Sequence, residues 1–317
     1  MANLYVCGEA LIDFVPDRTA DGAAAFQPKT GGSPYNAARA ASLAGADAWF
    51  VGALSSDLFG EQLEADLGAA GVNCSLALRS DDPTTLAFVD ISQGSPRYAF
   101  FNNGTATRNT SPPDDLIDPS PFDILEVGSI SLIDKPGAEH IADYCAKMAG
   151  RMRLSIDPNA RPSMTTDKQD WVDRINRLTG MATIIKISDE DLEYLAPGST
   201  PDAYAAQMLA GSAELVVVTL GEQGARGYSR AGTAQVTPPK IDVADTVGAG
   251  DALMGAMLAW LLEHCPDDNA PIGALSDRQL TDMLTFAAVG AAINCTRVGA
   301  APPTKAEILE SIGTATA

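Results

Sequence analysis

The chain has 317 residues and a formal net charge of −20, which comes from 41 acidic and 21 basic residues. A surface this acidic repels nucleic acid and anionic lipid, so we expect neither as a partner. Five cysteines without a C-x-x-C pair and only two histidines argue against a zinc finger and against a histidine-based triad. No apolar stretch reaches membrane-spanning length and the first residues lack a cationic signal-peptide start, so we expect a cytoplasmic protein.

The first third of the chain alternates between strand and helix patterns. Residues 4–8 predict a buried strand, with Glu9 and Asp13 at or just beyond its end. Ligands of open α/β sheets collect outside the carboxyl ends of the strands, which makes carboxylates at such an end candidate site residues. The pattern then predicts a short strand at 26–30, a helix at 36–43, a strand at 49–54 and a helix at 57–70.

A different pattern follows. Residues 84–91 and 97–101 alternate polar and apolar side chains around a turn at 92–96, which predicts a β-hairpin. Two exposed strands within an α/β series indicate a small sheet that stands off the main body.

The α/β pattern resumes at residue 122. It predicts strands at 124–127, 154–157, 183–187 and 214–220, a hairpin of 227–228 with 233–236, and helices at 137–148, 171–178, 189–195, 204–209, 252–263, 277–295 and 305–312. Alternating strands and helices predict a mostly parallel sheet with helices on both faces.

The most informative segment is Asp245-Thr246-Val247-Gly248-Ala249-Gly250-Asp251, which precedes an apolar helix. Small residues at a helix start let backbone N–H groups approach an anion. The N–H groups of Gly248, Ala249 and Gly250 would stabilise a transferred phosphoryl group, and Asp251 would accept the proton of the attacking hydroxyl. The loop is not a Walker A motif, because it contains no lysine.

Several motifs together make the chain resemble the ribokinase-like (PfkB) family of sugar kinases. They are GEALIDF, GGSPYNAA, D-x-F-G at 57–60, DPNARP, KISDEDL, VTLGEQGA and DTVGAGD, in this order. The resemblance spans nearly the whole length. It implies one α/β kinase domain over 1–317, with a Rossmann-like three-layer α/β/α core and a β-sheet lid whose strands are inserted around 14–31 and 84–105.

The resemblance also implies a sugar site under the lid. The matching positions are Asp13, Gly32, Asn36, Tyr98, Phe100, Asp157, Asn159 and Arg161. An ionised Asp accepts hydroxyl hydrogen bonds, and an amide can both donate and accept, so these residue types suit a polyol.

For the nucleotide, the resemblance implies ATP with Mg²⁺. The matching positions are Lys186, Ser188, Thr219, Gly221, Gly224, Ala287 and Asn294. The family's N-x-x-E element reads Ser188 and Asp191 here, and the shorter Asp favours a water-mediated contact with magnesium. Asp245, the Val247 carbonyl and the Gly299 loop occupy the places of a monovalent cation site, so K⁺ is a further expectation.

The segment after the double glycine is the best indicator of the substrate. Ribokinases usually have a lysine there, whereas Ser33-Pro34-Tyr35 looks like fructokinases. We therefore expect ATP-dependent phosphorylation of a primary hydroxyl of a neutral hexose, D-fructose. Alternatives are 2-keto-3-deoxygluconate kinase, which Arg97 or Arg108 would serve, and ribokinase. A silent sugar-sensing relative is disfavoured by the intact loop and base, and a dehydrogenase by the absence of G-x-G-x-x-G after the first strand. We expect a monomer or a homodimer through the lid.

Overall fold

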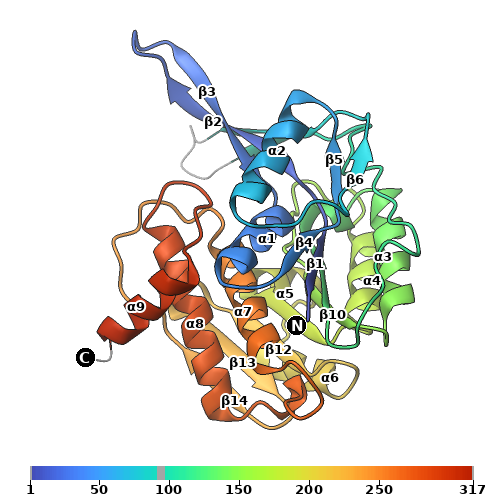
Figure 1. The fold of residues 1–317 in the computed structure, drawn as a ribbon, viewed down its shortest axis with the longest axis vertical. Coiled ribbons are helices and arrows are strands. Elements are labelled where there is room, and N and C mark those ends of the chain that lie inside the picture. Colours follow the sequence, from blue (N-terminus) through green and yellow to red (C-terminus); the bar gives the residue numbers. More distant parts are fainter. Residues whose placement is uncertain (1, 91–96, 316–317) are drawn as a thin grey trace.

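The computed structural model describes residues 2–90 and 97–315, which fold around one large sheet (Figure 1). Eight described strands form this sheet in the order β14-β13-β12-β11-β10-β9-β1-β4. The parallel strands are β1 (Leu4–Cys7), β4 (Ala48–Phe50), β9 (Ile124–Gly128), β10 (Arg153–Asp157), β11 (Ile184–Ser188) and β12 (Leu215–Thr219). Antiparallel β13 (Ala225–Ser229) and β14 (Thr233–Val236) extend one edge. The mostly parallel sheet predicted from the sequence is confirmed.

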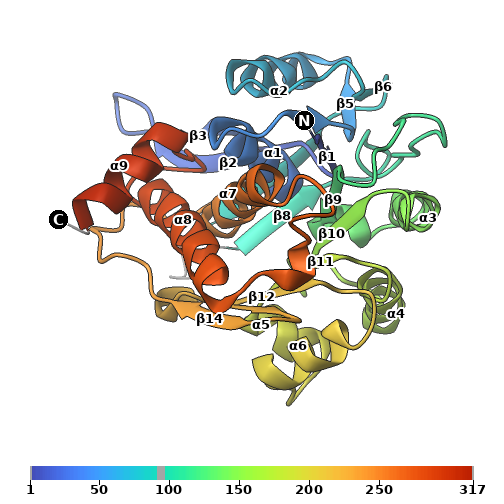
Figure 2. The same cartoon turned by 60° about the horizontal axis from the view of Figure 1, so that its bottom comes forward.

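Helices cover both faces of the sheet. Successive side chains of a strand point to opposite faces, so each strand contributes to two apolar cores. Leu4 and Val6 pack into one apolar core with α1 (Ser33–Leu43), α2 (Leu58–Ala69), α7 (Ala249–His264), α8 (Asp277–Cys295) and α9 (Lys305–Ala315). Tyr5 and Cys7 pack into the other with α3 (Gly137–Met148), α4 (Lys168–Thr179), α5 (Asp189–Leu195) and α6 (Pro201–Leu209). Figure 2 shows α7 and α8 on one side of the sheet and α3, α4 and α6 on the other. This is the predicted three-layer core.

A second sheet of four described strands forms the lid, in the order β3-β2-β7-β8. Its strands are β2 (Leu11–Arg18), β3 (Ala24–Gly31), β7 (Thr85–Asp90) and β8 (Arg97–Phe101). The predicted β7–β8 hairpin is confirmed by its antiparallel register, although its expected turn at 92–96 lies outside the described residues. Strands β2 and β3 extend away from the body (Figure 1).

The long first lid strand is a correction to the sequence analysis. Between the first strand and the first helix the apolar pattern predicts only a strand at 26–30, and the resemblance places lid strands around 14–31, whereas β2 begins at Leu11 and pairs with β3 along its whole length. Asp13 therefore lies within a lid strand and not in a loop beyond β1. Pro16 and the charged end of β2 hide the strand pattern, because an exposed two-stranded ribbon has no buried face to impose an apolar period.

The strand expected at 49–54 is also corrected, because the structure divides it between two sheets. Residues 48–50 form β4, and β5 (Ala53–Ser55) pairs with an unpredicted strand, β6 (Leu78–Ser80). The break falls at Gly52, where a Cβ would lie 2.3 Å from the Gly8 carbonyl oxygen. The chain can cross β1 so closely only without a side chain.

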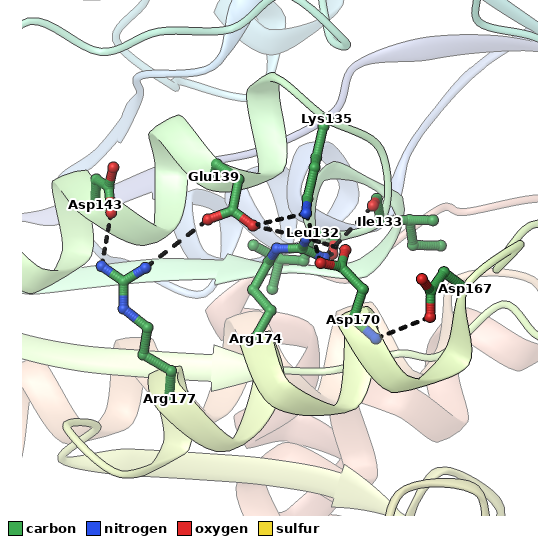
Figure 3. A network of polar contacts seen from close by, with 9 residues as sticks. All are labelled: Leu132, Ile133, Lys135, Glu139, Asp143, Asp167, Asp170, Arg174 and Arg177. Carbon is green, nitrogen blue, oxygen red and sulfur yellow. Dashed lines mark hydrogen bonds and ion pairs between the residues drawn. The ribbon is translucent and has the colours of Figure 1, made fainter.

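Short 3-10 turns connect some of these elements: η1 (Ser129–Leu132), η2 (Gly221–Gln223) and η3 (Ile272–Ala274). A buried arginine supports the first of them. The Arg174 guanidinium on α4 donates to the Leu132 carbonyl at 3.0 Å and forms ion pairs with Glu139 and Asp170 (Figure 3). The end of η1 is therefore held against α3 and α4.

Two expectations from composition can be compared with the structure. All five cysteines are free, and four of them are buried. Among the described residues, no helix is long and apolar enough to cross a membrane.

Candidate active site

A cavity of about 360 Å³ lies between the lid and the carboxyl ends of the parallel strands. Its walls come from the segment after β1, the start of α1, the lid strands β2 and β8, the turn η1, the segment after β10 and the loop before α7. This is the edge at which open α/β sheets bind ligands. A cavity of this volume is large enough for a small polar molecule.

The glycine loop forms one end of the cavity. Gly248 has a left-handed backbone with φ 74°, and a Cβ there would lie 2.7 Å from the Ala300 Cβ. Glycine is therefore required both by conformation and by space. Helix α7 begins at Ala249, so Gly248, Ala249 and Gly250 line the cavity at the start of a helix, where the Ala249 N–H donates to the Thr246 carbonyl at 3.2 Å.

The Asp251 carboxylate is held from two sides by helix α1. Its Oδ1 accepts a hydrogen bond from the Ser33 hydroxyl at 2.7 Å, and its Oδ2 accepts one from the Asn36 amide at 2.9 Å. Burial raises the pKa of Asp251, although both bonds oppose that shift. A carboxylate held in one orientation with a raised pKa is suited to general-base chemistry.

A buried ion pair lies beside the glycine loop. The Lys186 ammonium contacts the Asp157 carboxylate at 2.6 Å, and a Cβ on Gly250 would lie 3.3 Å from the same nitrogen. Burial alone would lower the pKa of Lys186, but Asp157, Asp191 and Asp251 around it outweigh burial and raise the pKa. Lys186 therefore provides a fixed positive charge next to the candidate anion site.

The segment after β10 connects to the same base. Asn159, with φ 38°, donates from its amide to the Ser33 hydroxyl at 2.7 Å, and Arg161 donates to the Asn159 side-chain oxygen at 2.6 Å. These bonds join Arg161, Asn159, Ser33 and Asp251 into one chain. Arg161 lines the cavity and forms no ion pair with the described residues, so its other donors can meet an anion.

The lid end of the cavity carries the carboxylate of Asp13 and two aromatic rings. Burial raises the pKa of Asp13 to about 6, against the attraction of Arg161. No described side chain or N–H group donates a hydrogen bond to this carboxylate, so its oxygens can accept from a ligand. Tyr98 and Phe100 on β8 stack at 5.7 Å and line the same space. The Asn36 side-chain oxygen, buried in the same wall, also has no hydrogen-bond partner among the described residues.

Gly32 shapes the turn into α1. Its φ is 109°, and a Cβ there would lie 2.6 Å from the Glu9 carbonyl oxygen. Its close packing against Glu9 accounts for this glycine without any contact to a ligand.

Of the residues expected on the nucleotide side, Lys186 lines this cavity and the others do not. Ser188 caps α5 by accepting from the Asp191 N–H, Thr219 ends β12, and a Cβ on Gly224 would lie 1.9 Å from the Val236 carbonyl oxygen. The backbone of Gly221 is left-handed, at φ 55°, with open space around it.

Two further nucleotide positions have no exposed surface. Ala287, expected on the wall of an adenine site, is fully buried in the apolar core. Asn294 is also fully buried, and its side chain bonds the Val247 carbonyl at 2.8 Å and the Ala301 N–H at 2.9 Å. Asn294 therefore holds the glycine loop to the loop after α8.

The candidate metal ligands already accept hydrogen bonds. Asp191 accepts from the Ala160 N–H at 2.9 Å. Asp245 accepts from the Val247 N–H at 3.0 Å and the Gly299 N–H at 2.8 Å, so the structure does bring these three positions together. No group of three or more His, Cys, Asp or Glu side chains among the described residues is arranged to hold a metal.

Sequence reasoning missed some residues of the cavity. Glu9, Ser33 and Ser129 line it but were not assigned to it, and neither were Leu11, Ile130 and Thr246. Glu9 had a usable signal as a carboxylate just after a buried strand, and Ser33 and Thr246 lie within motifs that the sequence analysis singled out. The others depend on contacts that are remote in sequence.

Comparisons with known proteins agree with this geometry. Residues 1–307 match the pfkB family carbohydrate kinase. A fructokinase of Rhizobium leguminosarum bv. trifolii is 38% identical over 260 residues, which cover 81% of this chain and 79% of that protein.

Solved structures are similar over almost the whole chain. The fructokinase of Xylella fastidiosa with bound ATP has a TM-score of 0.86 at 27% identity, and covers 99% of each chain. The fructokinase of Vibrio cholerae O395, bound to fructose, ADP and calcium, has a TM-score of 0.82 at 25% identity, and covers 98% of each chain. By its sequence and its fold, this chain belongs to the pfkB family of carbohydrate kinases.

Proposed function

We propose that this kinase transfers the γ-phosphoryl group of ATP to a primary hydroxyl of D-fructose. The observation that carries the proposal is a single polar cavity in which a buried base, Asp251, lies next to a glycine loop and a fixed cation, Lys186. The Rhizobium relative is named a fructokinase, and the two fructokinase structures contain ATP, or fructose with ADP. These names support ATP as the donor and fructose as the acceptor.

In this proposal each part of the cavity has a role. Asp13 and the free oxygen of Asn36 would accept hydroxyl hydrogens of the sugar, with a primary hydroxyl at Asp251. Asp251 takes up the proton as the hydroxyl attacks. The N–H groups of Gly248, Ala249 and Gly250, with Lys186 and Arg161, stabilise the charge on the transferred phosphoryl group. Tyr98 and Phe100 on the lid exclude water from the acceptor.

Magnesium fits the site as an ion brought by the nucleotide. When bound, Mg²⁺ neutralises the phosphate oxygens and orients the transferred group. Asp191 would hold it through water, and the Asp157 Oδ1, which is buried without a partner among the described residues, is a second candidate. Mg²⁺ usually keeps several waters in kinase sites, which agrees with so few protein ligands.

We extend the proposal to a monovalent cation beside the glycine loop, at Asp245, Val247 and Gly299. The Asp245 carboxylate and the Val247 carbonyl already accept hydrogen bonds, so K⁺ would have to share these oxygens. Equal activity in potassium and in tetramethylammonium salts would remove this part of the proposal.

A carboxylated sugar is the main alternative, and the structure gives it little support. Arg108, one of the two arginines expected to serve such a substrate, donates to the Asn103 side-chain oxygen and lies 3.9 Å from Asp134. The side chain of Arg97 lies outside the described residues. Ser33 occupies the place where ribokinases usually have a lysine, and its hydroxyl is engaged with Asp251. A neutral hexose therefore suits the cavity better than a sugar acid.

A kinase assay over ketoses, aldoses and sugar acids tests the proposal. D-fructose is expected to have the highest kcat/KM. Asp13→Ala is expected to weaken sugar binding by at least about tenfold, since a lost hydrogen bond to a charged group costs about 1.5–3 kcal/mol, and to leave ATP binding intact. A clear preference for 2-keto-3-deoxygluconate would overturn the assignment of fructose as the substrate and leave the phosphoryl-transfer chemistry in place.

We also propose that the protein works in the cytoplasm and forms a homodimer through the lid. Phe26 and Phe101 are 50% and 59% exposed on the lid and pack edge-on against Phe88. Exposed aromatic groups of this kind mark association surfaces. Light scattering of the wild type and of Phe101→Asp would test the dimer, and a wild-type monomer at assay concentrations would contradict it.

A further inference from the structure

Glu9 is a fully buried carboxylate that joins two walls of the cavity. It follows β1, is 1% exposed and lines the cavity. Its Oε1 accepts a hydrogen bond from the Ser33 N–H at 3.1 Å, and its Oε2 accepts one from the Ser131 N–H at 3.2 Å. One side chain thus bonds two segments that are remote in sequence.

Each of these segments carries part of the site. Ser33 is the first residue of α1, the helix whose Ser33 and Asn36 side chains hold Asp251. Ser131 belongs to η1, from which Ser129 and Ile130 line the cavity.

Both segments are held in place next to Glu9. The far end of η1 is fixed by Arg174 on α4 (Figure 3). On the other side, Gly32 packs so closely on Glu9 that a Cβ would lie 3.1 Å from the Glu9 Cγ. Glu9 therefore bonds α1 and η1 across a narrow gap that the Gly8 backbone also fills, since a Cβ there would lie 2.4 Å from the Pro34 Cγ and 3.1 Å from the Ser131 Oγ.

We propose that Glu9 is a positioning residue that fixes helix α1 and turn η1 on either side of the bound sugar. This inference rests on the proposed sugar kinase function. Glu9 acts through the two segments that it holds and takes no part in proton or phosphoryl transfer. Its loss should widen the sugar site and leave the nucleotide side unchanged.

A carboxylate at this position is unfavourable for folding, which points to a functional reason for it. Burial raises the pKa of Glu9 to about 7, and only hydrogen bonds from Ser33, Ser129, Ser131 and its own N–H oppose that shift. No cation among the described residues forms an ion pair with it. Buried carboxylates without a cationic partner are expensive to retain.

Glutamine is the sharpest substitution. It has nearly the same shape, but only one acceptor oxygen, so it can accept from Ser33 or from Ser131 but not from both. Asp123→Asn is a matched control. Asp123 is also a buried carboxylate that accepts two backbone N–H groups, from Asn3 at 2.7 Å and Ser120 at 2.9 Å. It directly precedes β9, at the opposite edge of the sheet.

The experiment measures KM for fructose, KM for ATP and kcat for the full-length wild type, Glu9→Gln and Asp123→Asn. Glu9→Gln is expected to raise KM for fructose by about tenfold and to leave KM for ATP unchanged. A fall in kcat should accompany it, because α1 also carries the Ser33 and Asn36 side chains that hold Asp251. Asp123→Asn is expected to lower Tm and to leave both KM values unchanged. Glu9→Asp, which keeps the charge on a shorter side chain, should show the same selective rise in KM.

Three results would overturn the inference: an unchanged KM for fructose in Glu9→Gln, an equal rise of both KM values, or an equal response of the Asp123→Asn control. Failure of both Glu9 variants to fold would show a structural role and would also overturn it. A wild type that phosphorylates no sugar contradicts the proposed function instead, so the two failures can be told apart.

Discussion

At the scale of single residues, the arrangement around Asp251 decides the chemistry. Three side chains from two segments, Ser33 and Asn36 on α1 and Asn159 after β10, form its hydrogen-bonded surroundings. The sequence motif contains the base and the glycines. It does not contain the groups that orient the base, because these contacts span 218 and 215 residues for Ser33 and Asn36.

Asp251→Asn is expected to lower kcat by at least about 10²-fold, the lower end of a general-base contribution. The side chain keeps its shape, so the fold should survive. Because burial raises the pKa of Asp251, its ionisation disfavours the folded state, and Tm at pH 8 should stay equal or rise. Steady-state kinetics measure kcat, and thermal unfolding measures Tm. A variant with near-normal kcat would show that another group is the base.

Ser33→Ala is expected to shift the acid limb of the pH profile of kcat/KM upward by roughly 0.5–1 pH unit. The Ser33 hydroxyl stabilises the ionised Asp251 carboxylate, so its removal raises the pKa of the base further. Activity well above that limb should approach the wild-type value.

Ser33→Thr retains a hydroxyl and should restore the wild-type limb. An acid limb that does not move in Ser33→Ala would mean that the hydroxyl does not influence the base.

At the scale of elements, the start of α7 and the end of β11 together form the anion site. The sequence places a glycine loop before a helix. Only the fold brings the Lys186 ammonium beside it, because β11 lies in the middle of the sheet and α7 covers one face. The lid shows the opposite case, since its β7–β8 hairpin and much of β3 follow from the local pattern, whereas β2 does not.

Gly250→Ala is expected to lower kcat by about tenfold or more and to leave sugar affinity unchanged. The new Cβ would lie 3.3 Å from the Lys186 Nζ, which is held by its ion pair and cannot yield easily. The disturbed donors act in the transition state rather than on the bound sugar.

Gly68→Ala is the matched control, because it also adds a methyl group within a helix but meets no atom within 4 Å. It should retain full activity. Sugar binding measured without nucleotide completes the comparison, and an equal loss of sugar affinity and turnover in Gly250→Ala would contradict the assignment.

At the scale of the whole molecule, the net negative charge and the burial of carboxylates both lower stability as the pH rises. The net charge of −20 repels itself, and burial raises the pKa of Glu9 to about 7 and of Asp13 to about 6. In both groups the folded state holds its proton more tightly than the unfolded chain. Stability is therefore lost as the pH rises from the ordinary carboxyl range through these raised values.

We expect the free energy of unfolding to be about 1 kcal/mol larger at pH 6 than at pH 8 from Glu9 alone. Thermal unfolding at the two pH values and constant ionic strength measures it. In Glu9→Gln much of this difference should disappear. A wild-type Tm that is higher at pH 8 than at pH 6 would contradict the raised pKa values.

The sequence alone determined the alternation of strands and helices, the mostly parallel sheet, the lid hairpin and the loop that ends in Asp251. These features depend on local patterns: apolar period, helix starts and glycines next to a carboxylate. Helices α3, α5 and α8 begin and end at the residues expected, because clear breaks in pattern flank them.

Only the tertiary structure decided which side chains meet. It joined Glu9 to Ser33 and Ser131, placed Lys186 next to Gly250, and buried Ala287, which the sequence analysis had assigned to a nucleotide site. The apolar pattern within one segment shows only which face of that helix or strand is buried. The partner that a polar group finds across the carboxyl edge of a sheet depends on how strands remote in sequence are ordered.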